Sequence, residues 1–547
     1  MSENRQIARA AGLVSFFTFI SRIFGLVRDS VVGYYFGTGP AADAFFVAFR
    51  IPNLLRRFVA EGAMSTAFIP VFTDYWTNRS RQEALRAASA IATVMAVGLA
   101  TITLVGILLS PWLTGVFAPG FLGEPGKYEL TVELTRWTFP YIFLVSLVAL
   151  CAGLLNSVRH FTAPAISPIV LNLTMIFAAA VVCPHLSVPV RGLAYGVLGG
   201  GVLQLALQLP PMIRLGIRLR PLWQPSHEAV RRALRLIAPM AFGAAVYQVN
   251  ILIDTVLASV LPSGSVSYLW YADRVFEFPI GIFAVALGTA AMPSFAAQAA
   301  RGAVDEMRRS LLFAMRMTNF IVIPAAVGIC LLSLPITTVL FERGAFGFDE
   351  AVRTANALSA FAIGLWSVSL VRLLVPAFYA LEDTRTPVVT AMGAFAANLV
   401  GSVTLMGAVA PTGESAVADG IAALTTHVAV LDLKHAGLAL STSIAATVNM
   451  GLLLWLLHRR IGGLGLRQLI PSLVRNLAAS AAMVPGVWYV SNLADWSQHG
   501  HLIERISVLA ASVTVGLVSF AVVQVMAGAS EIGAIVRLLR ERLHHRS

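Results

Sequence analysis

The chain has 547 residues, of which 57% are hydrophobic and 12% charged, with a formal net charge of +12 and a mean hydropathy of +0.78. Soluble domains carry about 25% charged residues, so this composition excludes a soluble protein and predicts an all-α polytopic membrane protein. The apolar runs are long and continuous, which excludes a barrel built from ~10-residue alternating strands. Positive charge in such a protein indicates cytoplasmic loops and lipid headgroups, and we expect no nucleic acid partner.

Fourteen apolar segments are long enough to cross a bilayer as helices. They fall near residues 10–36, 42–72, 86–113, 131–157, 162–184, 190–213, 236–261, 266–298, 311–340, 354–380, 387–410, 436–458, 470–494 and 505–527. If the N-terminus is cytoplasmic, 25 of the 39 Lys and Arg residues lie in inside segments and seven in outside segments. Cytoplasmic loops carry an excess of positive charge, so this asymmetry predicts 14 transmembrane helices with both termini in the cytoplasm.

A weak internal repeat has an offset of about 224 residues. Residues 28–31 align with 253–256, and residues 48–50 align with 272–274. A repeat of six spans keeps both halves in the same orientation, so we expect two six-helix pseudo-symmetric lobes related by an axis along the membrane normal. The resulting division is an N-lobe at 1–213, a basic cytoplasmic linker at 214–235, a C-lobe at 236–460, and helices 13 and 14 with a basic tail at 461–547.

No motif for ATP hydrolysis or for enzymatic catalysis occurs in the sequence. Gly126 and Lys127 lack the upstream glycine and the following Ser or Thr of a phosphate-binding loop, and paired-cysteine and HExxH metal motifs are absent. Cys151, Cys183 and Cys330 lie in apolar runs, and we interpret them as small core residues. We therefore expect no enzymatic activity, no cofactor and no metal site.

Charged residues inside the apolar segments carry the strongest functional signal. A charge at bilayer depth costs roughly 2.5–3.5 kcal/mol on insertion scales, so such residues face one another or a water-filled cavity. Asp43, Arg50 and Arg57 are spaced by seven residues, and Glu61 follows Arg57 by four. An unbroken helix would place these four side chains on one face, although we expect a kink or break at Pro52.

Two further segments contain similar groups of charges. Arg22 and Asp29 share a face of the first segment, and the sequence places Asp273, Arg274 and Glu277 within one helical turn in the eighth. Because the arginine fork fits phosphate, this pattern favours an anionic, phosphorylated amphiphile as the substrate. Ion pairs that only hold helices together remain the alternative. The arginines at apparent membrane depth are Arg22, Arg28, Arg50, Arg56, Arg57, Arg274 and Arg372.

Three motifs closely resemble those of the MurJ (MviN) family of lipid II flippases: SRIFGLVRD at 21–29, DAFFVAFRIPNLLRRFVAEGA at 43–63 and YADRVFEFPIG at 271–281. This family belongs to the multidrug/oligosaccharidyl-lipid/polysaccharide exporter superfamily. The resemblance implies that the chain moves undecaprenyl-diphosphate-linked disaccharide-pentapeptide from the inner to the outer leaflet of the bacterial cytoplasmic membrane, by alternating access, for peptidoglycan synthesis. It also implies that helices 13 and 14 form a groove for the lipid tail.

The resemblance also assigns roles to individual residues. Matching the family's functionally required charges are Arg22, Arg28, Asp43, Arg56 and Arg274. Neighbouring supporting charges in the same motifs are Asp29, Arg50, Arg57, Glu61, Asp273 and Glu277. Some relatives are sodium-coupled, and Asp254 and Asn398 fill two of the cation-binding positions, whereas Ser402 stands where a second acid is expected. A monovalent cation therefore remains an open partner, together with membrane lipids, and we expect a monomer.

Three alternatives remain at this point. A flippase for another polyprenyl-diphosphate-linked glycan, of the O-antigen or teichoic-acid type, would use the same charges. A drug exporter of the same fold predicts a net acidic cavity, whereas the charges here are net basic. A membrane glycosyltransferase would need catalytic residues in a large outer loop, and the loop at 411–434 contains no such motif. Because no ATP site is visible, we expect membrane potential or an ion gradient to supply the energy.

Overall fold

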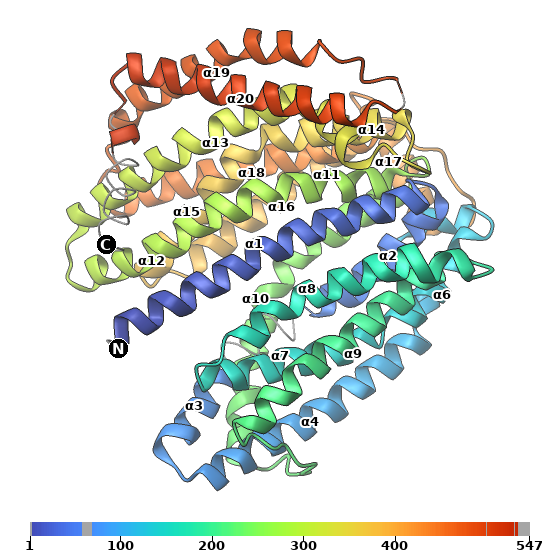
Figure 1. Cartoon of the computed structure of the whole chain (residues 1–547), viewed down its shortest axis with the longest axis vertical. Helices are drawn as coiled ribbons and strands as arrows, with labels where there is room; N and C mark the ends of the chain where they lie inside the picture. The colour runs from blue at the N-terminus through green and yellow to red at the C-terminus, as the bar shows by residue number, and fades with distance from the viewer. Residues whose placement is uncertain (1–2, 57–67, 499, 530, 534–547) are drawn as a thin grey trace. The chain divides into compact units, whose positions relative to one another are not determined.

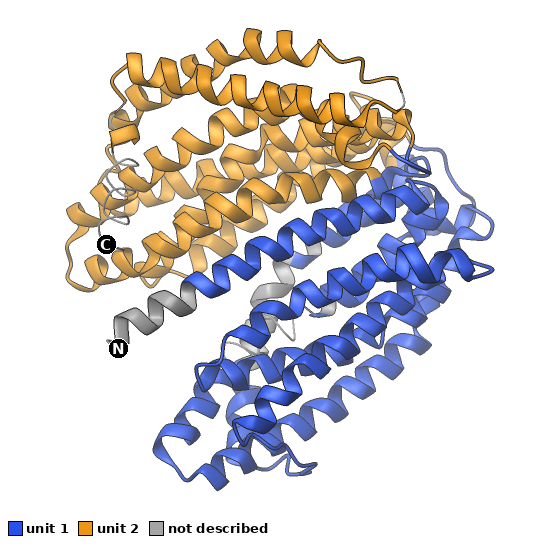
Figure 2. Cartoon of the chain, in the orientation of Figure 1, with its two compact units in different colours: residues 1–267, 343–346, 409–423 blue, residues 268–342, 347–408, 424–547 orange. Residues whose placement is uncertain are grey.

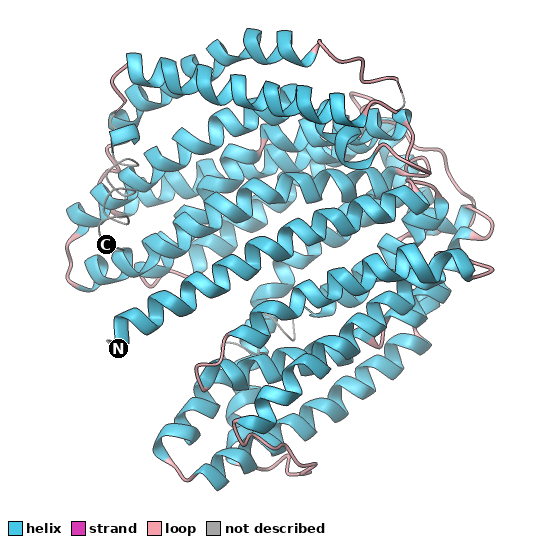
Figure 3. Cartoon of the chain, in the orientation of Figure 1, coloured by secondary structure: helices cyan, strands magenta, loops and turns pink. Residues whose placement is uncertain are grey.

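The computed structural model describes residues 3–56, 68–498, 500–529 and 531–533, and its regular structure is helical (Figures 1 and 3). Apart from two isolated bridges, these ranges contain no β-structure. By length and hydropathy, nine of the described helices could cross a membrane, and ten if the bent pair α14 (Phe348–Ile363) and α15 (Leu365–Ala380) forms one span. The predicted all-α polytopic membrane architecture is therefore confirmed.

The chain forms two compact units, drawn in blue and orange in Figure 2. Unit 1 comprises Met1–Ser267, Arg343–Phe346 and Val409–Ala423. Its helices are α1 (Glu3–Phe36), α2 (Pro40–Arg56), α3 (Ile69–Asn78), α4 (Arg81–Leu108), α5 (Ser110–Phe117), α6 (Lys127–Thr138), α7 (Tyr141–Ser157), α8 (Thr162–Phe177), α9 (Arg191–Arg214) and α10 (Glu228–Ser259).

Unit 2 comprises Tyr268–Glu342, Gly347–Ala408 and Leu424–Ser547. Two helices begin in unit 1 and continue into unit 2, namely α11 (Ser265–Pro279) and α17 (Ala416–Val428). Besides α14 and α15, the other helices of unit 2 are α12 (Val285–Ala300), α13 (Val304–Phe341), α16 (Arg385–Leu405), α18 (Lys434–Arg460), α19 (Ile470–Ser491) and α20 (Leu502–Met526).

Helix α2 continues through Pro52 to Arg56, so the break expected at this proline is absent. A proline inside a helix leaves the carbonyl four residues earlier without its usual N–H donor, and here that carbonyl belongs to Ala48. The hydroxyl of Thr138 in α6 donates a hydrogen bond to the Ala48 oxygen at 2.9 Å. Helix α6 therefore satisfies the backbone group that Pro52 leaves free, as a buried polar group requires.

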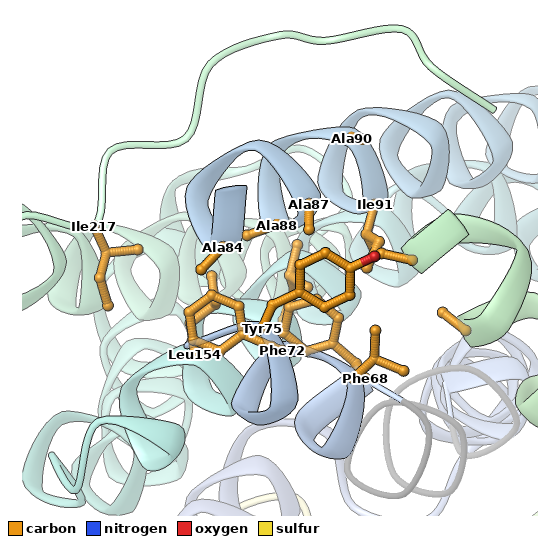
Figure 4. Close-up of a cluster of buried hydrophobic side chains, with 14 of the residues drawn as sticks. Phe68, Phe72, Tyr75, Ala84, Ala87, Ala88, Ala90, Ile91, Leu154 and Ile217 are labelled. Carbon is orange, nitrogen blue, oxygen red and sulfur yellow. The ribbon is translucent and has the colours of Figure 1, made fainter. Parts of the chain in front are cut away.

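A hydrophobic cluster in unit 1 joins α3 to α4 (Figure 4). Phe68, Phe72 and Tyr75 are almost completely buried, and small residues such as Ala84 and Ala88 of α4 face them. Their rings fill the space that the alanines leave, and Phe68 stacks on Phe72 with ring centroids 5.9 Å apart. This cluster fixes α3 directly after the segment at 57–67, which lies outside the described residues.

Residues 217–224 of the basic segment expected as a linker have no regular secondary structure and lie against α4, before α10 begins at Glu228. Its backbone binds to α4 at two points: the Arg220 N–H donates to the hydroxyl of Ser89, and the Leu222 N–H donates to that of Thr93. Ile217 is buried in the cluster described above, as Figure 4 shows. Hydrogen bonds and packing thus hold this segment against unit 1.

In unit 2, α19 packs on both α20 and α13. Gly486 and Gly516 allow α19 and α20 to approach closely, because a Cβ at either position would lie only 3.0 Å from a valine of the other helix. Small residues at such interfaces are typical of membrane helix pairs. Met483 of α19 and Phe520 of α20 form a buried cluster with Leu332 of α13, where the backbone of α13 departs from helical geometry.

A buried ion pair joins α20 to the end of α13. The Arg505 guanidinium lies 2.6 Å from a carboxylate oxygen of Glu342, and the exposed fractions of the two side chains are only 5% and 1%. Arg505 also donates to the backbone oxygens of Trp496 and Gln498, in the connection between α19 and α20. One side chain therefore ties three parts of unit 2 together at this end.

We predict that Arg505→Met lowers the free energy of unfolding by about 3–5 kcal/mol, because it leaves the Glu342 charge buried without its partner. Unfolding of the purified protein in detergent measures this change. Arg301→Met is the matched control, since it breaks the solvent-exposed pair with Glu306 (exposed fractions 66% and 49%) and should change stability little. Equal effects of the two substitutions would contradict a stabilising role for the buried pair.

Candidate functional site

Arg28 in α1 forms a charge-compensated group with its sequence neighbour. Its guanidinium makes contacts of 2.8–3.0 Å to the carboxylate of Asp29 and donates to the side-chain oxygen of Asn172 in α8 at 3.1 Å. The Asn172 amide in turn donates to the backbone oxygen of Ser21. The exposed fractions of Arg28 and Asp29 are 12% and 3%. The arginine fork is thus held in a fixed position by a carboxylate on its own helix.

Two other predicted arginines of unit 1 lie on α1 and α2 in partly buried positions. Arg22 is half-buried, seven residues before Asp29 and so on the same face of α1. Arg56 is also half-buried, and its Nε donates to the side-chain oxygen of Asn53 one turn earlier at 2.8 Å. The predicted residues Arg57 and Glu61 lie outside the described residues.

Arg50 of α2 contacts the neighbouring helix α10. Its guanidinium donates to the hydroxyl of Thr255 at 2.7 Å, and this hydroxyl also donates to the backbone oxygen of Ile251. Thr255 lies beside Asp254, one of the two predicted cation-binding residues. The sequence alone did not indicate this contact between α2 and α10.

Asp43 is a fully buried hydrogen-bond acceptor near the start of α2. One carboxylate oxygen accepts from the backbone N–H and the hydroxyl of Ser267, at 2.9 and 2.6 Å. The other accepts from the Gly264 N–H at 2.7 Å and lies 3.1 Å from the Lys127 ammonium. Ser267 belongs to the first turn of α11, whose N–H groups have no partner within the helix. Asp43 therefore caps the N-terminus of α11 from another helix.

Lys127 compensates the charge of Asp43, a role that the sequence pattern did not indicate. Its ammonium also contacts the Glu124 carboxylate at 3.0 Å and the Ser263 hydroxyl at 3.0 Å, and it lies 4.1 Å from the centre of the Phe121 ring. The residue is 3% exposed. The one sequence signal for Lys127 is that lysine occurs only twice in this arginine-rich chain.

Arg274 of unit 2 lies in α11 between two acids of the same helix. It contacts Glu277 at 3.2 Å and Asp273 at 3.7 Å, and its guanidinium lies 4.6 Å from the centre of the Trp270 ring. About a quarter of the Arg274 side chain is exposed. After Pro279 the helix changes to a π-helical turn before α12, a local irregularity that is frequent at functional sites. The predicted grouping of Asp273, Arg274 and Glu277 is therefore present.

The two predicted cation-binding residues belong to different units. Asp254 is half-buried in α10, and Asn398 is buried in α16. The hydroxyl of Ser441 in α18 lies 3.0 Å from the Asn398 side-chain oxygen and 2.6 Å from its backbone oxygen. Ser402, one turn after Asn398, is completely buried. Within the described ranges, no group of three or more His, Cys, Asp or Glu side chains could hold a metal ion.

Comparison with known proteins relates this arrangement to one family. The sequence profile of the family described as "Lipid II flippase MurJ" matches residues 32–507. A probable lipid II flippase MurJ of Vibrio cholerae is 34% identical over 538 residues, covering 96% of this chain and 97% of that protein. The lipid II flippase MurJ of Burkholderia cenocepacia is 36% identical over 513 residues, covering 92% of this chain and 94% of that protein.

Solved structures show the same fold. A lipid II flippase MurJ in an inward closed conformation has a TM-score of 0.73 at 23% identity, covering 94% of this chain and 98% of that one. A MATE family multidrug resistance transporter of the MOP superfamily in an inward-facing conformation has a TM-score of 0.65 at 14% identity, covering 83% and 98%. The family itself follows from the sequence matches, which cover most of the chain. The chain therefore belongs to the lipid II flippase MurJ family, whose members are transport proteins and not enzymes.

Proposed function

We propose that this flippase carries lipid II from the inner to the outer leaflet of the bacterial inner membrane by alternating access. Lipid II joins a polyprenyl tail to a disaccharide-pentapeptide through a diphosphate, so its charge lies between an apolar and a polar part. Arginine side chains bind phosphate oxygens with two parallel N–H donors. We assign this role to Arg22, Arg28, Arg56 and Arg274.

The observation that carries the proposal is that Arg28 and Arg274 are each compensated by acids of their own helix. A diphosphate oxygen can replace a carboxylate oxygen at the same guanidinium without leaving an unpaired positive charge. The displaced carboxylate then loses its partner, and this cost offsets part of the free energy gained by binding the diphosphate. A carrier needs this property, because it must release its substrate as well as bind it.

For Asp43 we propose a positioning role in addition to the substrate contact that the family resemblance implies. Four donors already surround its carboxylate, and three of them belong to the turn and helix start at Gly264 and Ser267. Arg274 lies two turns further along the same helix. Asp43 thus anchors the helix that carries Arg274, and loss of its hydrogen bonds would free the start of α11.

The proposal also includes the membrane topology. We propose fourteen membrane spans, arranged as two six-helix lobes and two further helices. Both termini then lie in the cytoplasm, and α19 and α20 are the pair that contacts the polyprenyl tail. Exposed apolar side chains on these helices suit such a ligand, among them Val474 and Leu477 of α19 and Leu517 of α20.

Membrane potential or an ion gradient supplies the energy, with Asp254 and Asn398 as candidate ligands for a monovalent cation, and the protein acts as a monomer.

We predict that Arg22→Ala, Arg56→Ala and Arg274→Ala each lower transport roughly 10- to 100-fold, because each removes charge-assisted hydrogen bonds worth about 1.5–3 kcal/mol. Growth of a conditional flippase-depletion strain and the amount of lipid II in the outer leaflet measure the effect. The corresponding lysine variants should retain part of the activity, since lysine keeps the charge but lacks the fork.

Arg301→Ala is the control for these variants, because Arg301 is an exposed residue directly after α12. This variant should support growth to the same extent as the unchanged protein. Full rescue by all three alanine variants at equal expression would mean that the arginines form structural pairs only. Failure of the unchanged chain to rescue, despite good expression, would instead favour another polyprenyl-linked glycan as its substrate.

A second prediction concerns the pair of Asp43 and Lys127. Lys127→Met should lower the free energy of unfolding by about 3–5 kcal/mol and reduce transport, because a buried carboxylate loses its compensating charge. The double variant with Asp43→Asn should recover part of the stability, since its amide has no charge to compensate. Unfolding in detergent and growth complementation measure the two effects.

Lys434→Met is the matched control for this pair, because Lys434 is the other lysine of the chain and is exposed. It should leave stability and growth unchanged. If Lys127→Met behaves like the control, or if adding Asp43→Asn recovers nothing, then the ion pair does not anchor α11 in the way proposed.

A further inference from the structure

The connection between α16 and α18 contains an additional helix, α17, whose surface is unusually apolar. Thirteen residues form this helix, and its only charged residue is Asp419, near the N-terminal end. Asp419 accepts hydrogen bonds from the backbone N–H groups of Thr412 and Gly413, so its charge stabilises the turn before the helix. These hydrogen bonds hold the pKa of the Asp419 carboxyl below its usual value. The rest of α17 contains no Asp, Glu, Lys or Arg.

The side chains of α17 form three stripes along the helix. Ser415, directly before the helix, and Ala418, Ala422 and Thr425 are buried, so small residues face the protein. A second stripe, about 100° away by helical geometry, contains the large apolar residues. Its members are Val417, Ile421, Leu424 and Val428, with exposed fractions of 54%, 48% and 38% for the three valine and leucine residues in chain order. The third stripe, on the far side, consists of exposed small or polar residues: Ala416, Gly420, Ala423 and His427.

The exposed apolar surface continues beyond the helix. Val430 and Leu431 are 78% and 49% exposed. Their backbone N–H groups both donate to the Thr404 carbonyl at the end of α16, at 2.8 and 3.2 Å. Val400, one turn earlier in α16, is 60% exposed. The apolar residues after α17 are therefore attached directly above the apolar surface of a membrane-spanning helix.

The stripe of large apolar residues on α17 continues into this surface of α16, so the surroundings of α16 indicate what covers the stripe. Helix α16 meets the length and hydropathy criteria for a membrane span, and only 28% of its most apolar window is buried inside the protein. Its exposed side chains include the large apolar Met392, Leu399 and Val400, which suit a surface in contact with lipid. Helix α17 has one exposed stripe of large apolar side chains and is held at the end of such a span, which is the position that interfacial helices occupy.

We propose that α17 lies in the lipid interface of the outer leaflet, with Val417, Leu424 and Val428 directed into the acyl region. Val430 and Leu431 extend the same contact to the end of α16. The occupant of this surface is lipid, and the stripe of Ala416, Gly420, Ala423 and His427 faces water. The contact with lipid depends on the described stripes and on their continuity with α16, whereas its assignment to the outer leaflet depends on the topology given under Proposed function.

Spin labels on single cysteines test this placement in the full-length protein. The background variant replaces Cys151, Cys183 and Cys330 by alanine and must still support growth of the depletion strain. Leu424→Cys and Ala423→Cys form a matched pair, because these exposed neighbours leave the helix about 100° apart. After reconstitution into phosphatidylcholine–phosphatidylglycerol vesicles, relaxation by oxygen and by a water-soluble nickel chelate reports the depth of each label.

We expect the label at Leu424 to lie about 5–10 Å deeper than the lipid phosphates, which is the depth of interfacial helices. The label at Ala423 should be accessible to the nickel chelate. Equal access of the chelate at both positions would overturn the proposal, since α17 would then lie in water. Protection of Leu424 from both oxygen and nickel would also overturn it, because a second copy or another protein would then cover the stripe.

A separate measurement tests the leaflet. His427→Cys in the same background should react with a membrane-impermeant thiol reagent added to spheroplasts, because it lies on the water-facing stripe outside the cell membrane. Reaction only after the membrane is opened would overturn the outer-leaflet assignment and the topology on which it rests. The depth measured at Leu424 would be unaffected by that result, so the two failures can be distinguished.

Discussion

Charged side chains that lie away from water need partners of opposite charge, and the described structure depends on this constraint. An unpaired charge at bilayer depth is expensive, yet a carrier for a diphosphate needs positive charge where the substrate passes. In the proposed site, pairing within the same helix meets both demands. Arg28 contacts the acid that follows it in α1, and Arg274 lies between two acids of α11. Such pairs remain compensated whatever a neighbouring helix does, because both members move together.

Ion pairs that join two different helices differ from these same-helix pairs in their position and contacts. Asp43 with Lys127, and Glu342 with Arg505, join segments far apart in the chain and are almost completely buried. Each pair also contacts backbone groups at helix ends or connections, where N–H or carbonyl groups need partners. Charges of this second type therefore fix where helices begin and end, whereas charges of the first type are the ones that we propose for the ligand.

The sequence was sufficient to predict the helical membrane architecture, the family and the grouping of Asp273, Arg274 and Glu277, because hydropathy and local spacing determine these features. Partners distant in sequence could not be predicted. Nothing in the periodicity connects Asp43 with Lys127, or Arg50 with Thr255, since these contacts depend on tertiary packing. The continuity of α2 through Pro52 was missed for the same reason: the hydroxyl that satisfies Ala48 belongs to Thr138, in another helix.

The Asp29 carboxylate that pairs with Arg28 bears on which anions can bind at this position. The cytoplasm contains nucleotides and inorganic phosphate at high concentration, and a bare guanidinium would attract all of them. Because Asp29 already occupies the fork, any incoming anion must displace a tethered competitor of high local concentration. A small soluble phosphate brings no other contacts to offset that displacement, whereas a lipid-linked diphosphate brings its tail and its sugars. If Arg28 binds the diphosphate as proposed, Asp29 would therefore select anions by what is attached to them.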